Sequence, residues 1–241
     1  QQEPVLILGA TAHIGNGELI ENSAILFEQG RITQVGRAAV IREADKRGYR
    51  VIEALGKHVY PGFISPSTSL GLIEIGAVRA TRDRDEVGTY NPNVRSLIAY
   101  NTDSRVVPTV RSNGVLMAQI TPRGGRISGT SSIVQLDAWN WEDAAYVADD
   151  GIHLNWMVLY RRTGWWAEQG EVKRNERYDE DLQELRRFFD EAQAYARKEK
   201  PAKRNLLLEG MRGLFEGRQQ LFIHADQVKS ITEAVLFAED Y

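Results

Sequence analysis

The hydrophobic pattern of the chain changes at Val59, and this change limits the possible folds more than any other feature. Before it, residues 5–60 contain only short segments rich in β-branched and aliphatic residues, which are typical of strands. These segments are Val5–Leu8, Ser23–Glu28, Arg31–Val35 and Arg50–Glu53. A tight turn at Gln29-Gly30-Arg31 predicts that Ile25–Val35 is a hairpin. The more charged run Val40–Arg50 is predicted to hold a short helix.

After Val59, segments typical of strands and helices follow one another along the chain. The predicted strands are Val59–Ile64 (broken at Pro61-Gly62), Gly114–Thr121, Ile133–Leu136 and Gln220–Ile223. The predicted helices are Val94–Tyr100, Val106–Asn113, one within residues 141–161, Asp179–Tyr195, Leu206–Leu214 and Val228–Ala238. Such alternation predicts parallel strands that are joined by crossover helices.

Composition excludes several classes of protein and site. The 241 residues are 42% hydrophobic and 26% charged, as in an ordinary soluble protein, and no run approaches the ~18 apolar residues of a membrane span. The net charge of -3 gives no basic excess for binding nucleic acid. Cysteine is absent, so a metal would be held by carboxylates, a modified lysine or the four histidines. These are His13, His58, His153 and His224.

Two other stretches are candidates for contact with a ligand. Arg123–Ser132 is rich in glycine, but a strand follows it and no Gly-Lys-Ser/Thr ending is present. We therefore expect a hairpin turn there, with a loop that contacts substrate as the alternative. The loops between residues 73 and 110 and the Trp165-Trp166 segment are expected to shape a pocket.

Three stretches carry a resemblance to a known family. The first comprises Ile7-Leu-Gly-Ala-Thr11, Gly15-Asn-Gly17 and Ile25–Gly36, the second is Leu55–Ile64 with its Pro61-Gly62, and the third is Leu221-Phe-Ile-His-Ala-Asp226 followed by Ile231–Glu239. Together they cover most of residues 5–72 and 205–241. In these stretches the chain resembles the amidohydrolase superfamily, and within it the imidazolonepropionase-related enzymes.

The resemblance implies an α/β fold with two parts. Residues 1–56 would form the amino-terminal part of a small β-sandwich, and residues 57–241 would form the first half of a (β/α)₈ TIM barrel. An eight-unit barrel alone needs about 250 residues, so we expect this chain to be incomplete. The rest of the barrel would come from a longer chain, or else from a second polypeptide. Assembly of several copies into an oligomer is a further alternative.

The resemblance also implies a metal site, but the chain departs from the family pattern there. The family has Asp-x-His-x-His after its Pro-Gly-x-Ile, and this chain has Ser65-Pro-Ser-Thr-Ser69. Ser65 takes the position of the Asp, and Ser67 and Ser69 take those of the two histidines. Hydroxyl groups are poor ligands for zinc or iron compared with imidazole. We therefore expect one divalent metal, zinc or iron, or none.

The remaining candidate site residues lie near the end of the chain. His224 is the candidate metal ligand, with an ordinary hydrogen-bonded histidine as the alternative. Asp226 is a candidate pocket residue, although a cap of the last helix is the favoured role, and Ser65 is a second pocket candidate. His153 is expected to be structural, and His13 and His58 match no ligand of the family.

These observations predict a hydrolase that acts on non-peptide or dipeptide C–N bonds of a small molecule, with an altered or mononuclear metal site. The alternative is an inactive amidohydrolase-like binding protein or the partner subunit of an active relative. Serine chemistry at Ser67 or Ser69 with His224 as the base is disfavoured, because no Gly-x-Ser-x-Gly elbow is present. The chain starts at Gln1 and lacks cysteine, so we expect export to a bacterial periplasm; a cloning boundary is the alternative.

Overall fold

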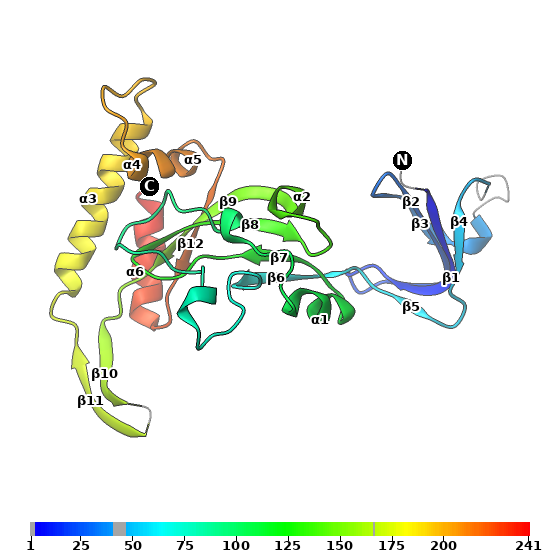
Figure 1. Cartoon of the computed structure of the whole chain (residues 1–241), viewed down its shortest axis with the longest axis horizontal. Helices are drawn as coiled ribbons and strands as arrows, with labels where there is room; N and C mark the ends of the chain where they lie inside the picture. Colours follow the sequence, from blue (N-terminus) through cyan, green and yellow to red (C-terminus); the bar gives the residue numbers. More distant parts are fainter. Residues whose placement is uncertain (1–2, 41–46, 166) are drawn as a thin grey trace. The chain divides into compact units, whose positions relative to one another are not determined.

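The chain divides into two compact units in the computed structural model, Gln1–Gly62 and Phe63–Tyr241, which we call unit 1 and unit 2 (Figure 1). The structure describes residues 3–40, 47–165 and 167–241. Most of the helix predicted within Val40–Arg50 falls on residues 41–46, outside the described residues. Among the residues that are described, no helix is both long enough and apolar enough to cross a membrane.

Unit 1 is built on one sheet. Its strands are β1 (Val5–His13), β2 (Leu19–Glu28), β3 (Arg31–Arg37), β4 (Arg50–Glu53) and β5 (His58–Val59), with the order β3-β2-β1-β4 and β5 also paired to β1. The predicted hairpin is confirmed, because β2 and β3 pair antiparallel. Gln29 and Gly30 both have a positive φ, as a two-residue hairpin turn requires. Leu6, Ala24 and Leu26 form the small core.

Unit 2 contains a second five-stranded sheet with the order β12-β9-β8-β7-β6. Its strands are β6 (Phe63–Thr68), β7 (Val115–Ile120), β8 (Ile127–Gln135), β9 (Ala145–Asn155) and β12 (Gln220–His224). β6 pairs parallel to β7 and β9 parallel to β12, whereas β8 is antiparallel to both of its neighbours. The expectation of parallel strands throughout is therefore wrong for β8, because the short connection before it is no crossover.

The helix predicted within residues 141–161 is present only over its first four residues. Only α2 (Trp141–Ala144) is helical; the side chain of Asn140 caps it by accepting a hydrogen bond from the Asp143 amide at 2.8 Å. The chain then enters β9, which pairs with β8 on one side and β12 on the other. In this strand Ile152 and Leu154 are completely buried in the cluster with Phe189 and Phe237, and this burial favours the strand.

The other predicted helices are present, with some differences in length. These are α1 (Val106–Ser112), α3 (Tyr178–Ala196), α4 (Leu206–Gly210), α5 (Arg212–Phe215) and α6 (Val228–Glu239). The predicted helix Leu206–Leu214 is thus split in two. Within the predicted helix Val94–Tyr100 only Ser96–Ala99 is helical, as the short 3-10 helix η4. A second 3-10 helix, η3, covers Arg79–Thr81.

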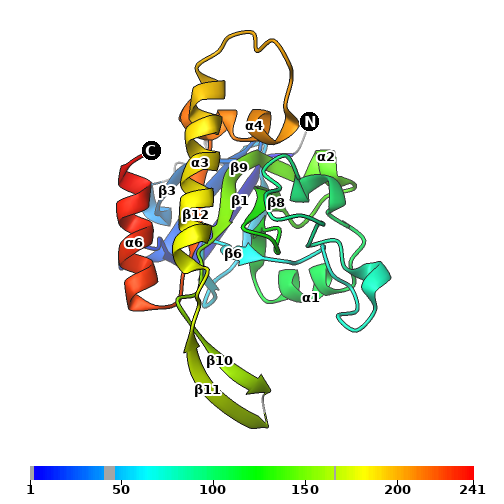
Figure 2. The same cartoon turned by 90° about the vertical axis from the view of Figure 1, so that its left-hand side faces the viewer.

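A two-stranded hairpin of β10 (Tyr160–Trp165) and β11 (Glu168–Arg174) projects from unit 2 (Figure 2). All residues of both strands are exposed. Trp165, from the segment expected to shape a pocket, ends β10, and Trp166 lies outside the described residues.

The core of unit 2 lies on one face of its sheet. Ile152 and Leu154 of β9 pack with Phe189 of α3 and Phe237 of α6, and these two helices lie side by side in Figures 1 and 2. A second cluster joins Ala118, Ile120 and Val134 to Val107 of α1. Alternate residues of a strand point to opposite faces. Gln119, His153 and Phe222, which alternate with these apolar residues, therefore point to the other face of the sheet.

Candidate functional site

The carboxyl ends of four strands meet at one edge of the unit 2 sheet. β6, β7, β9 and β12 all run in the same direction, since only β8 is reversed. Each carries a polar side chain within its last few residues: Ser67, Gln119, His153 and His224. In sheets of this kind, ligands bind at the carboxyl ends of the strands. This edge is therefore the candidate site.

Two histidines from distant parts of the chain meet there. Nδ1 of His153 lies 2.8 Å from Nε2 of His224, and the two rings are stacked with their centroids 5.1 Å apart. The ring of His153 also stacks on Phe222, which is its partner in the parallel pairing of β9 and β12. His153 is completely buried, and among the described residues its Nε2 has no hydrogen-bond partner. The histidine expected to be structural thus holds the candidate ligand His224.

Both imidazoles are held in their neutral form. The pKa of His153 is lowered to about 3, chiefly by burial and to a smaller extent by electrostatic interaction with His224 and Arg123. Burial is also the largest cause that lowers the pKa of His224, followed by the charge of Arg123, while Asp226 raises it. A neutral imidazole has one ring nitrogen that donates and one that accepts. At neutral pH each histidine therefore keeps a lone pair.

The serine segment does not place its hydroxyl groups together. In a regular strand Ser65, Ser67 and Ser69 would share one face. Here the register with β7 shifts between Ser65 and Thr68, and Ser67 has a φ of +47°. Ser65 and Ser69 line a cavity of about 370 Å³ beside α1.

Ser67 points elsewhere and is held by the end of β7. Its amide donates to Oε1 of Gln119 at 3.2 Å. Nη2 of Arg123 donates to the carbonyl oxygen of Ser67 at 2.8 Å and to its Oγ at 3.3 Å. In the described part of the chain the hydroxyl of Ser67 thus contacts a guanidinium group rather than the imidazole that a nucleophilic serine needs.

Gln119 extends this network toward the centre of the sheet. Its Nε2 donates to Oδ2 of Asp150 at 2.7 Å, and Oγ of Ser131 donates to the other oxygen of that carboxylate at 2.7 Å. Asp150 is thus bound on both oxygens. Sequence reasoning missed Gln119 and Asp150, because their partners are distant in sequence and no short motif includes them, whereas Arg123 begins the glycine-rich stretch that was a candidate for contact with a ligand.

Arg123 follows β7 in the glycine-rich connection, which is the hairpin turn that the sequence predicted. Glycine is needed here because a Cβ at Gly125 would lie 2.8 Å from the carbonyl oxygen of Thr89. Arg123 is half-buried, and both of its side-chain hydrogen bonds go to Ser67. Within residues 3–40, 47–165 and 167–241, no carboxylate forms an ion pair with its guanidinium group.

The residues present do not by themselves fit a zinc or iron site. The described residues contain no group of three or more His, Asp or Glu side chains that could hold a metal. Zinc takes three or four protein ligands, and the two imidazoles at this edge are hydrogen-bonded to each other.

Asp226 was predicted to cap the last helix, and this prediction is wrong. The helix α6 starts after Gln227, which is its N-cap residue and makes no side-chain capping bond. Asp226 is exposed just beyond β12 and acts on the site through its charge, which raises the pKa of His224.

The other two histidines form a pair in unit 1. Nε2 of His13 lies 2.9 Å from Nδ1 of His58, and the ring of Tyr60 stacks on His13 at 4.0 Å.

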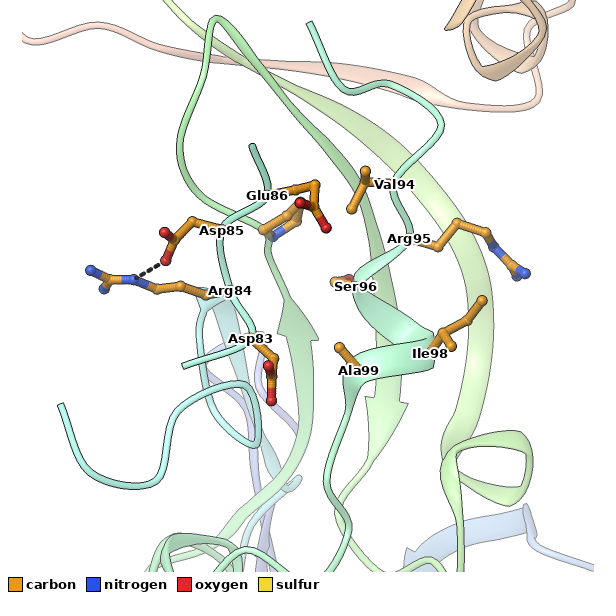
Figure 3. Close-up of a pocket in the computed structure, with 10 residues that line it drawn as sticks. Asp83, Arg84, Asp85, Glu86, Val94, Arg95, Ser96, Ile98 and Ala99 are labelled. Carbon is orange, nitrogen blue, oxygen red and sulfur yellow. Dashed lines mark ion pairs between the residues drawn. The ribbon is translucent and has the colours of Figure 1, made fainter. Parts of the chain in front are cut away.

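The loops between residues 73 and 110 enclose a cavity of about 520 Å³ (Figure 3). Asp83–Glu86 lie on one side and Val94–Ala99 on the other, and Pro122 completes the lining. Arg84 pairs with Asp85 at 3.6 Å, and its carbonyl oxygen accepts a hydrogen bond from the amide of Arg123 at 2.6 Å. The cavity therefore adjoins the connection that carries Arg123.

Comparison with solved structures finds a similar fold in an amidohydrolase from Thermotoga maritima. The two chains are 18% identical with a TM-score of 0.78, and the similarity covers 98% of this chain. This chain spans 62% of the length of the Thermotoga maritima protein.

Similarities to other structures cover less of the chain. A molinate hydrolase is 32% identical over 29% of this chain and 15% of its own, with a TM-score of 0.26. A D-hydantoinase is 23% identical over 41% of this chain and 19% of its own, with a TM-score of 0.25. No protein-family model and no curated protein matches the chain. The mixed α/β fold described above is thus similar to a large part of an amidohydrolase fold.

Proposed function

We propose that this chain is part of an amidohydrolase-type hydrolase that acts on a small molecule with a non-peptide or dipeptide C–N bond. One observation carries the proposal: over 98% of its length the chain follows the fold of an amidohydrolase, and polar side chains gather at the carboxyl edge of its parallel strands. In barrels built from such strands, the reacting groups lie at this edge.

The residues at this edge are suited to holding a small polar molecule. Nε2 of His224 faces His153, so its Nδ1 is the ring nitrogen left for a ligand. Arg123 supplies a positive charge, and the cavity beside Pro122 adjoins it. A resident zinc or iron would need ligands in addition to these residues. Such ligands, with the rest of a barrel, would come from a longer chain or a second polypeptide. Export of the protein to a bacterial periplasm stays a prediction.

The test combines metal analysis with turnover. The protein from its native source is analysed for bound zinc and iron and assayed on cyclic amides, ureides and dipeptides. We expect hydrolysis of one of these classes, which His224→Ala reduces and His58→Ala in unit 1 leaves unchanged. Absence of turnover on all three classes would contradict the proposal.

A second candidate is a non-catalytic protein that binds a ligand at the same edge or pairs with an active relative. The observation that favours it is that Ser67 is held by Gln119 and Arg123 while Ser69 lines the cavity beside α1, so the two positions of the family's histidines do not converge on one point. Under this reading the protein binds a small C–N compound in calorimetry without hydrolysing it. Tight stoichiometric binding of a metal at His224 in the wild type would contradict it.

A further inference from the structure

We propose that Arg123 and His224 together bind the carboxylate group of a small molecule, with His153 as the residue that positions His224. The ligand class is an N-acylated amino acid or a dipeptide. The inference rests on the proposed function only for the C–N bond of that ligand, since binding of the carboxylate requires no turnover.

The first argument is the unpaired charge of Arg123. Other partly buried arginines of unit 2 have carboxylate partners: Arg95 pairs with Asp149 at 2.8 Å, and Arg126 with Asp181 at 3.2 Å. Arg123 lies in the same connection as Arg126, yet in the described residues it has only the neutral oxygen atoms of Ser67. These hydrogen bonds use Nη2 alone, which leaves Nη1 and Nε for another acceptor. A guanidinium group with free donors is the preferred partner of a carboxylate.

The second argument is the position of the protons in the histidine pair. Nε2 of His153 is buried without a partner. A buried N–H donor without an acceptor is rarer and more costly than a buried lone pair, so Nε2 of His153 is the unprotonated nitrogen. His153 then carries its proton on Nδ1 and donates it to Nε2 of His224. As a consequence, the proton of His224 lies on Nδ1.

This tautomer decides what His224 can bind. A protonated Nδ1 donates a hydrogen bond, which suits an anionic oxygen, whereas a metal requires a lone pair on that nitrogen. The surrounding charge agrees, because the effect of Arg123 on the pKa of His224 exceeds the opposing effect of Asp226. Geometry places Arg123 at the same edge: the strand partner of His224 is Asn155, whose Nδ2 donates to the carbonyl oxygens of Gly124 at 3.3 Å and Gly125 at 3.0 Å, directly after Arg123. The site thus offers a cation and a neutral donor at one edge of the sheet, and this combination favours a carboxylate.

The test uses the imidazole resonances of the whole chain in ¹H–¹⁵N NMR. Substituting each histidine by Gln in turn assigns them. In the wild type we expect the proton on Nδ1 of both His153 and His224; a proton on Nε2 of His224 would overturn the inference without any variant at the site.

The binding arm titrates N-acetylglycine against N-acetylglycinamide at constant ionic strength. We expect saturable shifts of His224 with the acid alone, while His13 and His58 serve as internal controls. Arg123→Gln should weaken binding about tenfold or more, and Arg123→Lys less, because lysine keeps the charge but not the planar fork. Arg111→Gln, which removes an arginine paired with Asp137, should leave the affinity unchanged.

Three results would overturn the proposal: equal shifts with the amide, equal affinity in Arg123→Gln, or equal binding of inorganic phosphate. If Arg123→Gln fails to fold, Ser67→Ala keeps the guanidinium group and should retain binding. The outcome is separate from that of the proposed function: carboxylate binding without turnover upholds this inference alone, and turnover without a carboxylate requirement upholds only the hydrolase.

Discussion

Burial of the neutral His153 should make unit 2 less stable as the pH falls, because its ring takes up a proton more readily in the unfolded chain. Its pKa in the folded state is about 3, against about 6.5 for a histidine in an unfolded chain. Below about pH 6.5 the unfolded state therefore binds more protons than the folded state. The stabilisation by the neutral ring is complete above the unfolded pKa and is lost progressively as the pH falls toward 3.

The size of the effect follows from the same values. Stability changes by about 1.4 kcal/mol for each pH unit within this window, so about 2 kcal/mol should be lost between about pH 7 and pH 5. In this interval the loss depends on the unfolded pKa and requires only that the folded pKa of His153 lies well below 5. Other groups also respond to acid, so the difference between wild type and a His153 variant isolates this contribution.

Tryptophan fluorescence provides the assay. All five tryptophans follow residue 138 and so belong to unit 2, and Trp156 is buried in its core. Urea unfolding at about pH 7 and pH 5 gives the free energy of unfolding for wild type, His153→Gln and the control His13→Gln. His153→Gln should lose stability with pH by about 2 kcal/mol less than the other two proteins. A pH dependence of His153→Gln equal to that of the wild type would refute the reasoning.

Three further predictions concern the packing and the backbone of unit 2. Phe189→Ala should lower the free energy of unfolding in urea by about 3–5 kcal/mol, because Phe189 is completely buried against Phe237, and a loss below about 1 kcal/mol would show that the core readjusts. Gly151→Ala should lower the melting temperature, since its Cβ would overlap the ring of Phe222; an unchanged value would mean that the ring moves freely. Ser67→Gly should raise stability by about 1 kcal/mol, because glycine adopts a positive φ without strain, and a decrease would assign more weight to the bond from Arg123.

Local patterns predicted those elements of the fold that local patterns determine. The alternating apolar residues and the glycine turn of Ile25–Val35 specify a hairpin by themselves. The helix α3 carries its apolar residues on one face, and acidic residues crowd its first turn, so its limits could be placed within a residue or two.

Elements defined by distant partners could not be predicted in this way. β9 is a strand because β8 and β12 flank it, and neither neighbour is visible in the local pattern of residues 145–155. The same holds for the candidate site, since His153 and His224 are 71 residues apart. The serine segment suggested a lost metal site, but only the structure shows that Ser67 binds Arg123 while Ser65 and Ser69 line a separate cavity.

The reversed direction of β8 has a consequence for the order in which unit 2 folds. Its pairings with β7 and β9 close short loops, whereas the outer pairings join residues such as Phe63 and Val115, or Gly151 and Gln220, across much longer segments. Because short loops close at a lower entropic cost, the sheet should nucleate at β7, β8 and β9 and gain β6 and β12 later. In pulsed hydrogen exchange during refolding, amides of β8 should become protected before those of β12, and the reverse order would exclude this pathway. The strands that carry Ser67 and His224 would then be the last to join the sheet.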